Sequence, residues 1–122
     1  MQLYFDNAAT SFPKPDEVLD AMLSYQRFCG ASPGRGAYTH AIEATNILDS
    51  CRTLLCELVH GPSSEHCIFT HNCTDALNLA ICGIITHCIA QDTPVHIVTT
   101  AMDHNSVLRP LHSFQSQGVT HT

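Results

Sequence analysis

The chain has 122 residues, and its 5 lysines and arginines against 11 aspartates and glutamates give a net charge of −6. Nucleic-acid binding is therefore not expected, because the chain lacks the basic surface that binds phosphate backbones. No signal-peptide pattern follows Met1 and no apolar run looks long enough to cross a bilayer, so we expect a cytoplasmic protein without a membrane partner.

Helical spacing of apolar residues dominates the first half of the chain. It predicts a helix over about residues 16–28, which begins after Pro15, and a second helix over about 38–60. A loop rich in Gly, Ser and Pro, at 30–36, joins the two. No linker or internal repeat divides the sequence, so residues 1–122 are expected to form part of one domain with a modest core.

Short strands alternate with helices in the second half. We expect strands at 67–70 and 95–100, helices at 76–90 and 105–117, and a new strand after Gly118, which ends the last helix. Helices between strands imply right-handed crossover connections, so the strands should be parallel. The expected fold is α/β, with a mostly parallel sheet covered by helices.

The junction after the 67–70 strand is a candidate anion site. Thr74 is the predicted N-cap of the helix that follows, and the free N–H groups of its first turn attract phosphate. Asp75 would repel an anion unless its side chain turns away, and a plain capped helix is the alternative interpretation. Like Thr74, His104 follows directly after a predicted strand, and ligands of parallel sheets bind beyond the carboxyl ends of the strands.

Four separated motifs appear in a characteristic order. They are Tyr4–Ser11, Ser32–Tyr38, Asn72–Ala76 and Met102–Pro110. In order and spacing they resemble the N-terminal part of the class V aminotransferases, and most of all the cysteine desulfurases. The resemblance covers essentially the whole chain. It implies a three-layer αβα, fold type I (aspartate aminotransferase-like) major domain, here incomplete, and pyridoxal 5′-phosphate as the cofactor.

The resemblance also implies roles for single residues. Thr74, through its hydroxyl and nearby amides, would hold the cofactor phosphate, with the Cys73 N–H and with Asp75 beside it. His104 would stack on the pyridine ring and assist proton transfer at the substrate, as the catalytic residue. Asp75 and Asp103 stand where the family commonly has Glu, and both keep the carboxylate.

Substrate contacts are implied for the N-terminal motifs. Asn7, Ala8 and Ala9 match a stretch beside the substrate carboxylate, and Arg35 matches a loop near the dimer interface and the active-site entrance. The substrate would be L-cysteine, which the enzyme, expected as a homodimer, converts to alanine and an enzyme-bound persulfide.

The residue that tethers this cofactor has no match in the sequence. The family's Schiff-base lysine lies beyond residue 122, and the single lysine here, Lys14, sits in a Pro-rich turn that favours a solvated structural role. We therefore expect a truncated chain. Two alternatives to a desulfurase segment remain open: an inactive fragment that binds phosphate or a partner subunit weakly, and a segment of a selenocysteine lyase or another class V aminotransferase.

Seven cysteines and nine histidines raise a zinc site as a further possibility. The cysteine spacings are wider than those of common zinc motifs, so no metal site is expected. An odd number of cysteines also favours reduced thiols over a set of disulfides.

Overall fold

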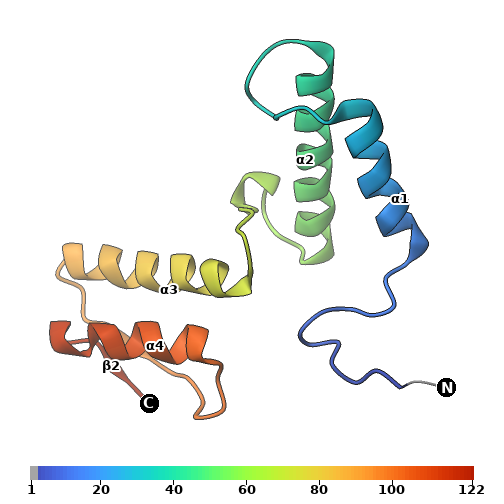
Figure 1. Cartoon of the computed structure of the whole chain (residues 1–122). Coiled ribbons are helices and arrows are strands. Elements are labelled where there is room, and N and C mark those ends of the chain that lie inside the picture. Colours follow the sequence, from blue (N-terminus) through green and yellow to red (C-terminus); the bar gives the residue numbers. More distant parts are fainter. Residues whose placement is uncertain (1–2) are drawn as a thin grey trace. The chain divides into compact units, whose positions relative to one another are not determined.

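The structure is a computed structural model that describes residues 3–122. Its contacts divide the chain into two compact units, Met1–Cys67 and Ile68–Thr122 (Figure 1). The residues of the expected cofactor site lie in the second unit, and those of the expected substrate contacts lie in the first.

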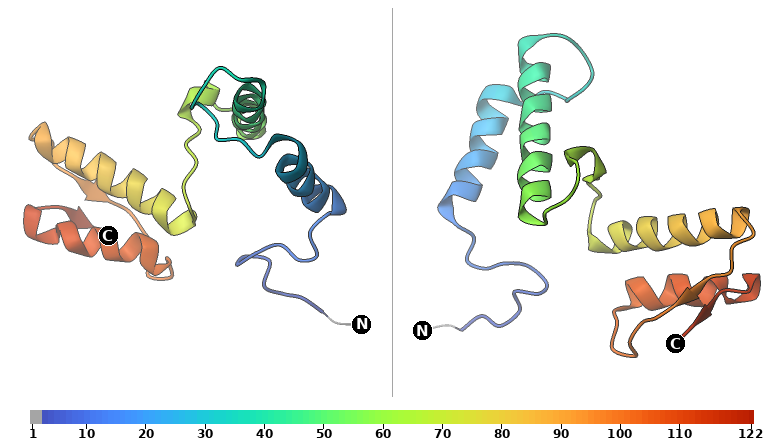
Figure 2. Two further views of the ribbon diagram at one scale, coloured as in Figure 1. Left: turned by 45° about the horizontal axis from the view of Figure 1, so that its top comes forward. Right: turned by 180° about the vertical axis from the view of Figure 1, so that it is seen from behind.

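Two helices form most of the first unit. Helix α1 (Asp16–Ser24) continues into a π-helical turn, η1 (Tyr25–Cys29), which ends at Gly30 with φ of 54°. Helix α2 (Thr39–Leu58) lies beside them, as both views of Figure 2 show. The two predicted helices are thus confirmed. The positive φ at position 30 favours glycine, because a residue without a side chain adopts this left-handed conformation at little steric cost.

The predicted strand at 67–70 is wrong. A short 3₁₀ turn, η2 (Ser64–His66), precedes it, and residues 67–70 pair with no strand among residues 3–122. The Cys67 carbonyl accepts a hydrogen bond from Arg52 Nε at 3.2 Å, and the Ile68 side chain is 69% exposed. The apolar composition of this segment favours a strand, but a strand also needs a neighbour to pair with.

The second unit contains the sheet. Helix α3 (Cys73–Ala90) leads to strand β1 (His96–Ile97), and helix α4 (Asn105–Phe114) with a 3₁₀ turn, η3 (Gln115–Gln117), leads to strand β2 (Thr120–His121). The two strands are parallel, with His96 opposite Thr120 and Ile97 opposite His121. Because α4 connects them, the expected parallel sheet with a crossover helix is confirmed, although only two short strands are paired in the described residues.

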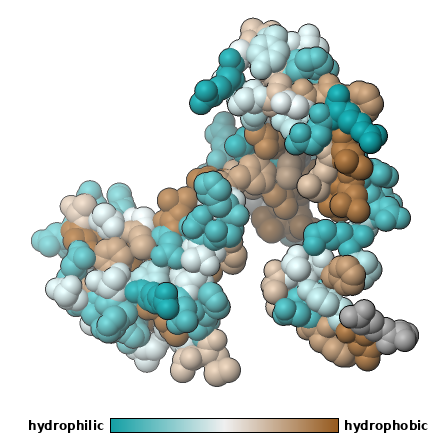
Figure 3. All heavy atoms as spheres, in the orientation of Figure 1, coloured by the Kyte–Doolittle hydropathy of each residue, from teal (hydrophilic) through white to brown (hydrophobic). Residues whose placement is uncertain are grey.

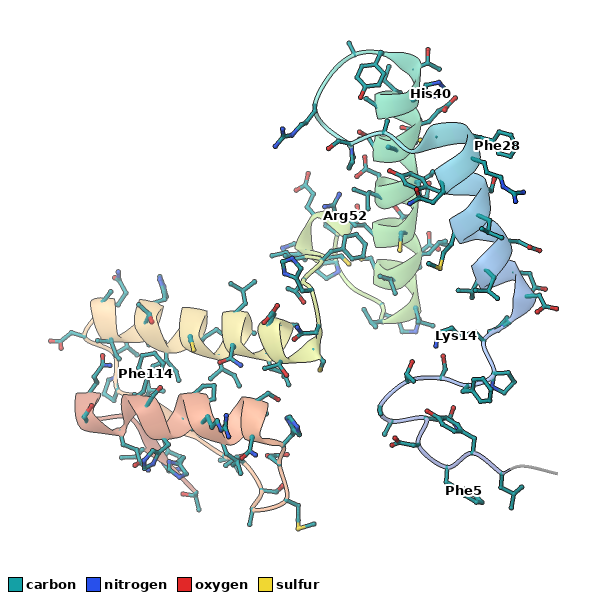
Figure 4. All side chains as sticks on the ribbon, viewed as in Figure 1. Phe5, Lys14, Phe28, His40, Arg52 and Phe114 are labelled. Atoms are coloured by element: carbon teal, nitrogen blue, oxygen red, sulfur yellow. The ribbon has the colours of Figure 1, made fainter. Side chains whose placement is uncertain are left out.

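The core of the second unit lies between α3, α4 and the strands. Ile85, Leu111 and Val119 are buried there, and partly buried apolar side chains surround them: Ile81, Ile89, Val95, Ile97, Val107 and Phe114 (Figure 4). Full burial of a Leu or Ile side chain contributes about 1.5–3 kcal/mol. This cluster therefore holds α4 against α3.

Helix α3 corrects one expectation from the sequence. With 18 residues and a mean hydropathy of 1.5, it is long and apolar enough to cross a membrane by length and composition. A mostly buried core helix of a soluble protein passes the same test; only 6% of this helix is buried, although one face of α3 packs against α4 and the strands. Apolar side chains also show brown over parts of the surface of α1 and α2 in Figure 3; Leu54 of α2 is 65% exposed.

Candidate functional site

The start of α3 is capped by Asn72. Its side-chain Oδ1 accepts the Asp75 N–H at 2.9 Å, and its carbonyl accepts the Thr70 hydroxyl at 2.9 Å and the Ala76 N–H at 3.1 Å. The prediction of Thr74 as the N-cap is therefore wrong. Asn is as good a capping residue as Thr. The correction moves Thr74 inside the first turn of the helix, where its own N–H lies at the helix end.

This capping leaves a set of open donors at the N-terminus of α3. The N–H groups of Cys73 and Thr74 and the Thr74 hydroxyl have no hydrogen-bond acceptor within residues 3–122, and both residues are exposed. A phosphate group fits this arrangement, because it can accept hydrogen bonds from two adjacent backbone N–H groups and a hydroxyl. The positive end of the dipole of this 18-residue helix also attracts it. The donors thus fit the phosphate of the expected cofactor.

The carboxylate of Asp75 is held by the residues before the helix. Its Oδ2 lies 3.4 Å from Asn72 Nδ2 and 3.5 Å from His71 Nδ1. With the cap from Asn72 to the Asp75 N–H, these contacts form a variant of the capping box. Asp75 is therefore engaged in shaping the turn, which answers in part the objection that it would repel an anion.

His104 is the N-cap of α4. Its Nδ1 accepts the Ser106 N–H at 3.1 Å and lies 2.9 Å from Ser106 Oγ. Because Nδ1 acts as an acceptor, the hydrogen bonds assign the proton of the neutral ring to Nε2. The imidazole is exposed, so its second nitrogen and its face are accessible to a ligand.

The loop before His104 is ordered by Asp103. The Asp103 carboxylate accepts hydrogen bonds from the Thr99 hydroxyl and, at 2.9 Å, from the Thr100 N–H. The Thr99 hydroxyl, followed by the Thr100 N–H, lowers the pKa of Asp103 below its ordinary value of 3.8. The carboxylate at this position thus ties the segment that follows β1 to the turn that presents His104.

Asn78 connects the two helix starts and was not predicted from the sequence. Its side-chain Nδ2 lies 2.8 Å from the Thr74 carbonyl of α3 and 3.4 Å from the Ser106 carbonyl of α4. In the sequence, its position one helical turn after Thr74 could have pointed to the first of these contacts. The second contact could not be predicted from neighbouring residues, because Ser106 is 28 residues away.

The predicted substrate residues lie in the first unit. Asn7 Oδ1 accepts the Phe12 N–H at 3.2 Å, and the Ala9 N–H closes a turn onto the Asp6 carbonyl at 3.1 Å, with Ala8 inside that turn. Asn7, Ala8 and Ala9 are all exposed. Asn7 therefore has a structural role in the turn whether or not it also contacts a substrate.

Arg35 lies in the exposed loop between η1 and α2. This loop is fixed where the Gly34 N–H donates to Thr45 Oγ1 at 3.1 Å and the Tyr25 hydroxyl donates to the Ala31 carbonyl at 2.5 Å. Within the described part of the chain, no ion pair or hydrogen bond engages the Arg35 guanidinium. It remains available to an anionic partner.

Lys14 lies in an exposed turn, as predicted. Its Nζ donates to Thr10 Oγ1 at 3.0 Å and to the Ser11 carbonyl at 2.9 Å (Figure 4).

No group of three or more His, Cys, Asp or Glu side chains among residues 3–122 is arranged to hold a metal ion.

The second unit is thus an α/β unit with open N–H donors at the start of α3 and a capping histidine at the start of α4. Open donors at a helix start are suited to a phosphate group. The family model for class-V aminotransferases matches residues 3–121. The chain belongs to the class-V aminotransferase family, whose members depend on pyridoxal 5′-phosphate.

Curated relatives are desulfurases. A probable cysteine desulfurase of Streptomyces coelicolor is 37% identical over 110 residues, which are 88% of this chain and 26% of that protein. A mitosomal cysteine desulfurase of Trachipleistophora hominis is 31% identical over 117 residues, 96% of this chain and 26% of that protein. The chain thus spans about a quarter of the length of these relatives.

Solved structures show the same fold. A NifS-like protein matches 100% of this chain and 32% of its own with a TM-score of 0.85 at 24% identity. A cysteine desulfurase from Thermococcus onnurineus NA1, in its apo form, gives a TM-score of 0.82 at 28% identity and covers 98% of this chain and 29% of that one. A structure described as SspA in complex with cysteine gives 0.81 at 28% identity, with 98% of this chain and 33% of that one covered. The expected fold type is confirmed.

Proposed function

We propose that this chain forms the phosphate-binding and ring-stacking part of the cofactor site of a pyridoxal-phosphate-dependent cysteine desulfurase. The open donors of Cys73 and Thr74 at the start of α3 are the observation that carries the proposal. Family membership and the desulfurase relatives support pyridoxal phosphate as the ligand and L-cysteine as the substrate.

Each site residue has a defined task in this proposal. Cys73 and Thr74 bind the phosphate through two N–H groups and a hydroxyl, and the exposed imidazole of His104 stacks on the ring and carries a proton at Nε2. Asn7, Ala8 and Ala9 lie beside the carboxylate of the substrate, and Arg35 belongs to the loop near the dimer interface and the active-site entrance. When bound, pyridoxal phosphate supplies an electron sink for the substrate's Cα electrons. The products of the reaction are alanine and an enzyme-bound persulfide. The whole enzyme is proposed to be a cytoplasmic homodimer.

A second function, non-catalytic phosphate binding by the chain alone, is favoured by Lys14. Its amine is engaged by Thr10 and Ser11 in the first unit, so it is poorly placed as the tethering group that the chemistry needs. We propose this function for the isolated 122-residue chain and the desulfurase reaction for the whole protein.

The test compares pyridoxal phosphate with pyridoxal, which lacks the phosphate. The binding of both is measured by equilibrium dialysis in a Lys14→Arg background, which removes covalent reaction at that amine. We expect selective binding of the phosphorylated form, and Thr74→Ala should weaken it by about ten- to a hundredfold, since a hydrogen bond to a charged group contributes about 1.5–3 kcal/mol.

Thr86→Ala is the matched control. Thr86 is exposed on the same helix α3 but far from its N-terminus, so its loss should leave both affinities unchanged. Equal affinity for pyridoxal and pyridoxal phosphate, or equal effects of the two substitutions, would contradict the cofactor site. Sulfide release from L-cysteine by the 122-residue chain would contradict its non-catalytic role.

A further inference from the structure

We infer that Asn78 is a positioning residue that holds the phosphate donors of α3 and the histidine of α4 at a fixed separation. The inference rests on the proposed function for the identity of the ligand. Its geometric basis is independent of that ligand, because both hydrogen bonds of Asn78 are made within the chain.

The two hydrogen bonds of Asn78 reach the first turns of both helices. A side-chain amide carries two N–H donors on one nitrogen, and here that nitrogen faces the Thr74 carbonyl at 2.8 Å and the Ser106 carbonyl at 3.4 Å. Asn78 is partly buried, and its hydrogen bond to the Ser106 carbonyl is partly shielded from competing water.

Ser106 extends the connection to His104. It is 6% exposed, and its N–H donates to His104 Nδ1 at 3.1 Å. One continuous series of hydrogen bonds therefore joins Thr74, Asn78, Ser106 and His104. Thr74 is at the phosphate end of the proposed cofactor site, and His104 is at its ring end.

Apolar packing alone would not fix this separation. The core contacts of Ile85 and Leu111 hold α3 against α4 further along both helices. Hydrophobic contact is not directional and tolerates small shifts of one helix along the other, whereas the placement of groups around a bound reactant tolerates much less. Asn78 supplies the directional contact at the end of the helix pair where the ligand binds.

The test replaces Asn78 by Leu, which keeps the size of the side chain but removes both donors. The first measurement needs no ligand: hydrogen exchange of the Ser106 amide and the ring ¹⁵N shifts of His104, both by NMR. We expect Asn78→Leu to speed exchange at Ser106 about tenfold, since the two hydrogen bonds that join the first turns of α3 and α4 are lost. We also expect it to shift the His104 ring signals.

Thr86→Leu introduces the same residue at an exposed site of the same helix and should change neither readout. If Asn78→Leu retains the exchange rate and the ring shifts of the unsubstituted chain, the residue only fills space and the inference is overturned. Should the variant not fold, exchange of the Asn78 side-chain amide protons in the unsubstituted chain decides. Slow exchange supports the inference, and exchange as fast as that of a free amide overturns it.

Ligand binding provides the second measurement and separates the two proposals. Asn78→Leu should weaken pyridoxal phosphate about three- to tenfold although Asn78 itself makes no proposed contact with the phosphate. Asn78→Leu could change the ligand-free readouts while the unsubstituted chain shows no preference for pyridoxal phosphate over pyridoxal. That result would support the role of Asn78 and contradict the proposed cofactor. If the chain binds pyridoxal phosphate selectively and Asn78→Leu leaves that affinity unchanged, the result would support the cofactor and contradict the role of Asn78.

Discussion

The Nδ1 atom of His104 accepts the backbone N–H of Ser106 at 3.1 Å, so the histidine proposed to stack on the cofactor also caps α4. The cap fixes the direction of the imidazole, and it places the ring proton on Nε2. Catalytic orientation and helix stability therefore depend on the same hydrogen bond.

His104→Ala and His104→Asn should separate these two roles. Alanine removes both the cap and the ring, and we expect the free energy of unfolding, measured with urea, to fall by about 1 kcal/mol. Asparagine caps helices well, so His104→Asn should unfold near the concentration of urea that unfolds the original chain. Both variants should bind pyridoxal phosphate more weakly, because both lack the ring. Normal binding by His104→Asn would contradict the stacking role.

Local signals located the helices well. The spacing of apolar residues and the residues at helix ends are contained within a few positions of the sequence, and α1, α2, α3 and α4 all lie where these signals placed them. The choice of Thr74 over Asn72 as the cap of α3 was wrong: both residue types cap helices, they stand only two positions apart, and Asn is the better cap of the two.

Structural features that depend on residues far apart in the sequence could not be predicted from neighbouring residues. The segment at 67–70 has the composition of a strand, but pairing needs a neighbouring strand, and none is present within residues 3–122. In the same way, the hydrogen bond from Asn78 to Ser106 joins positions 28 residues apart. The candidate cofactor residues were found through motifs, whereas the contact that connects them needed the structure.

Asn72→Ala should destabilise α3. The substitution removes the acceptor of the Asp75 N–H and the contact to the Asp75 carboxylate, and we expect a loss of about 1 kcal/mol in the free energy of unfolding. Asn72→Ser keeps a capping oxygen and should lose much less. Urea unfolding followed by circular dichroism measures both. Equal losses for the two variants would show that the side-chain cap is not what stabilises the helix start.

Asp103 should make the second unit sensitive to acid. Hydrogen bonds from the Thr99 hydroxyl and the Thr100 N–H lower the pKa of Asp103 in the folded chain, so the folded state binds fewer protons at this carboxyl than the unfolded state does. Its contribution to stability is present above the ordinary pKa of 3.8 and is lost as the pH falls through the lower, folded value.

Asp103→Asn should accordingly flatten the dependence of the urea midpoint on pH between neutral pH and about pH 3. Thr99→Val, which removes the first of the two donors, should flatten it in part. The measurement is a series of urea unfolding curves across this range, together with an NMR titration of the Asp103 carboxyl. An unchanged acid dependence in Asp103→Asn would show that this carboxyl does not stabilise the fold.

Leu111→Ala should be the most destabilising of these substitutions. Leu111 is 1% exposed between α3, α4 and the strands, and truncating a buried leucine costs about 2–5 kcal/mol through lost transfer energy and the cavity that remains. Leu79→Ala is the matched control, since Leu79 on α3 is 57% exposed, and it should change stability by less than about 1 kcal/mol. Thermal unfolding monitored by circular dichroism distinguishes the two. Similar midpoints for both variants would mean that the cluster of Ile85, Leu111 and Val119 is not the core that holds α4 against α3.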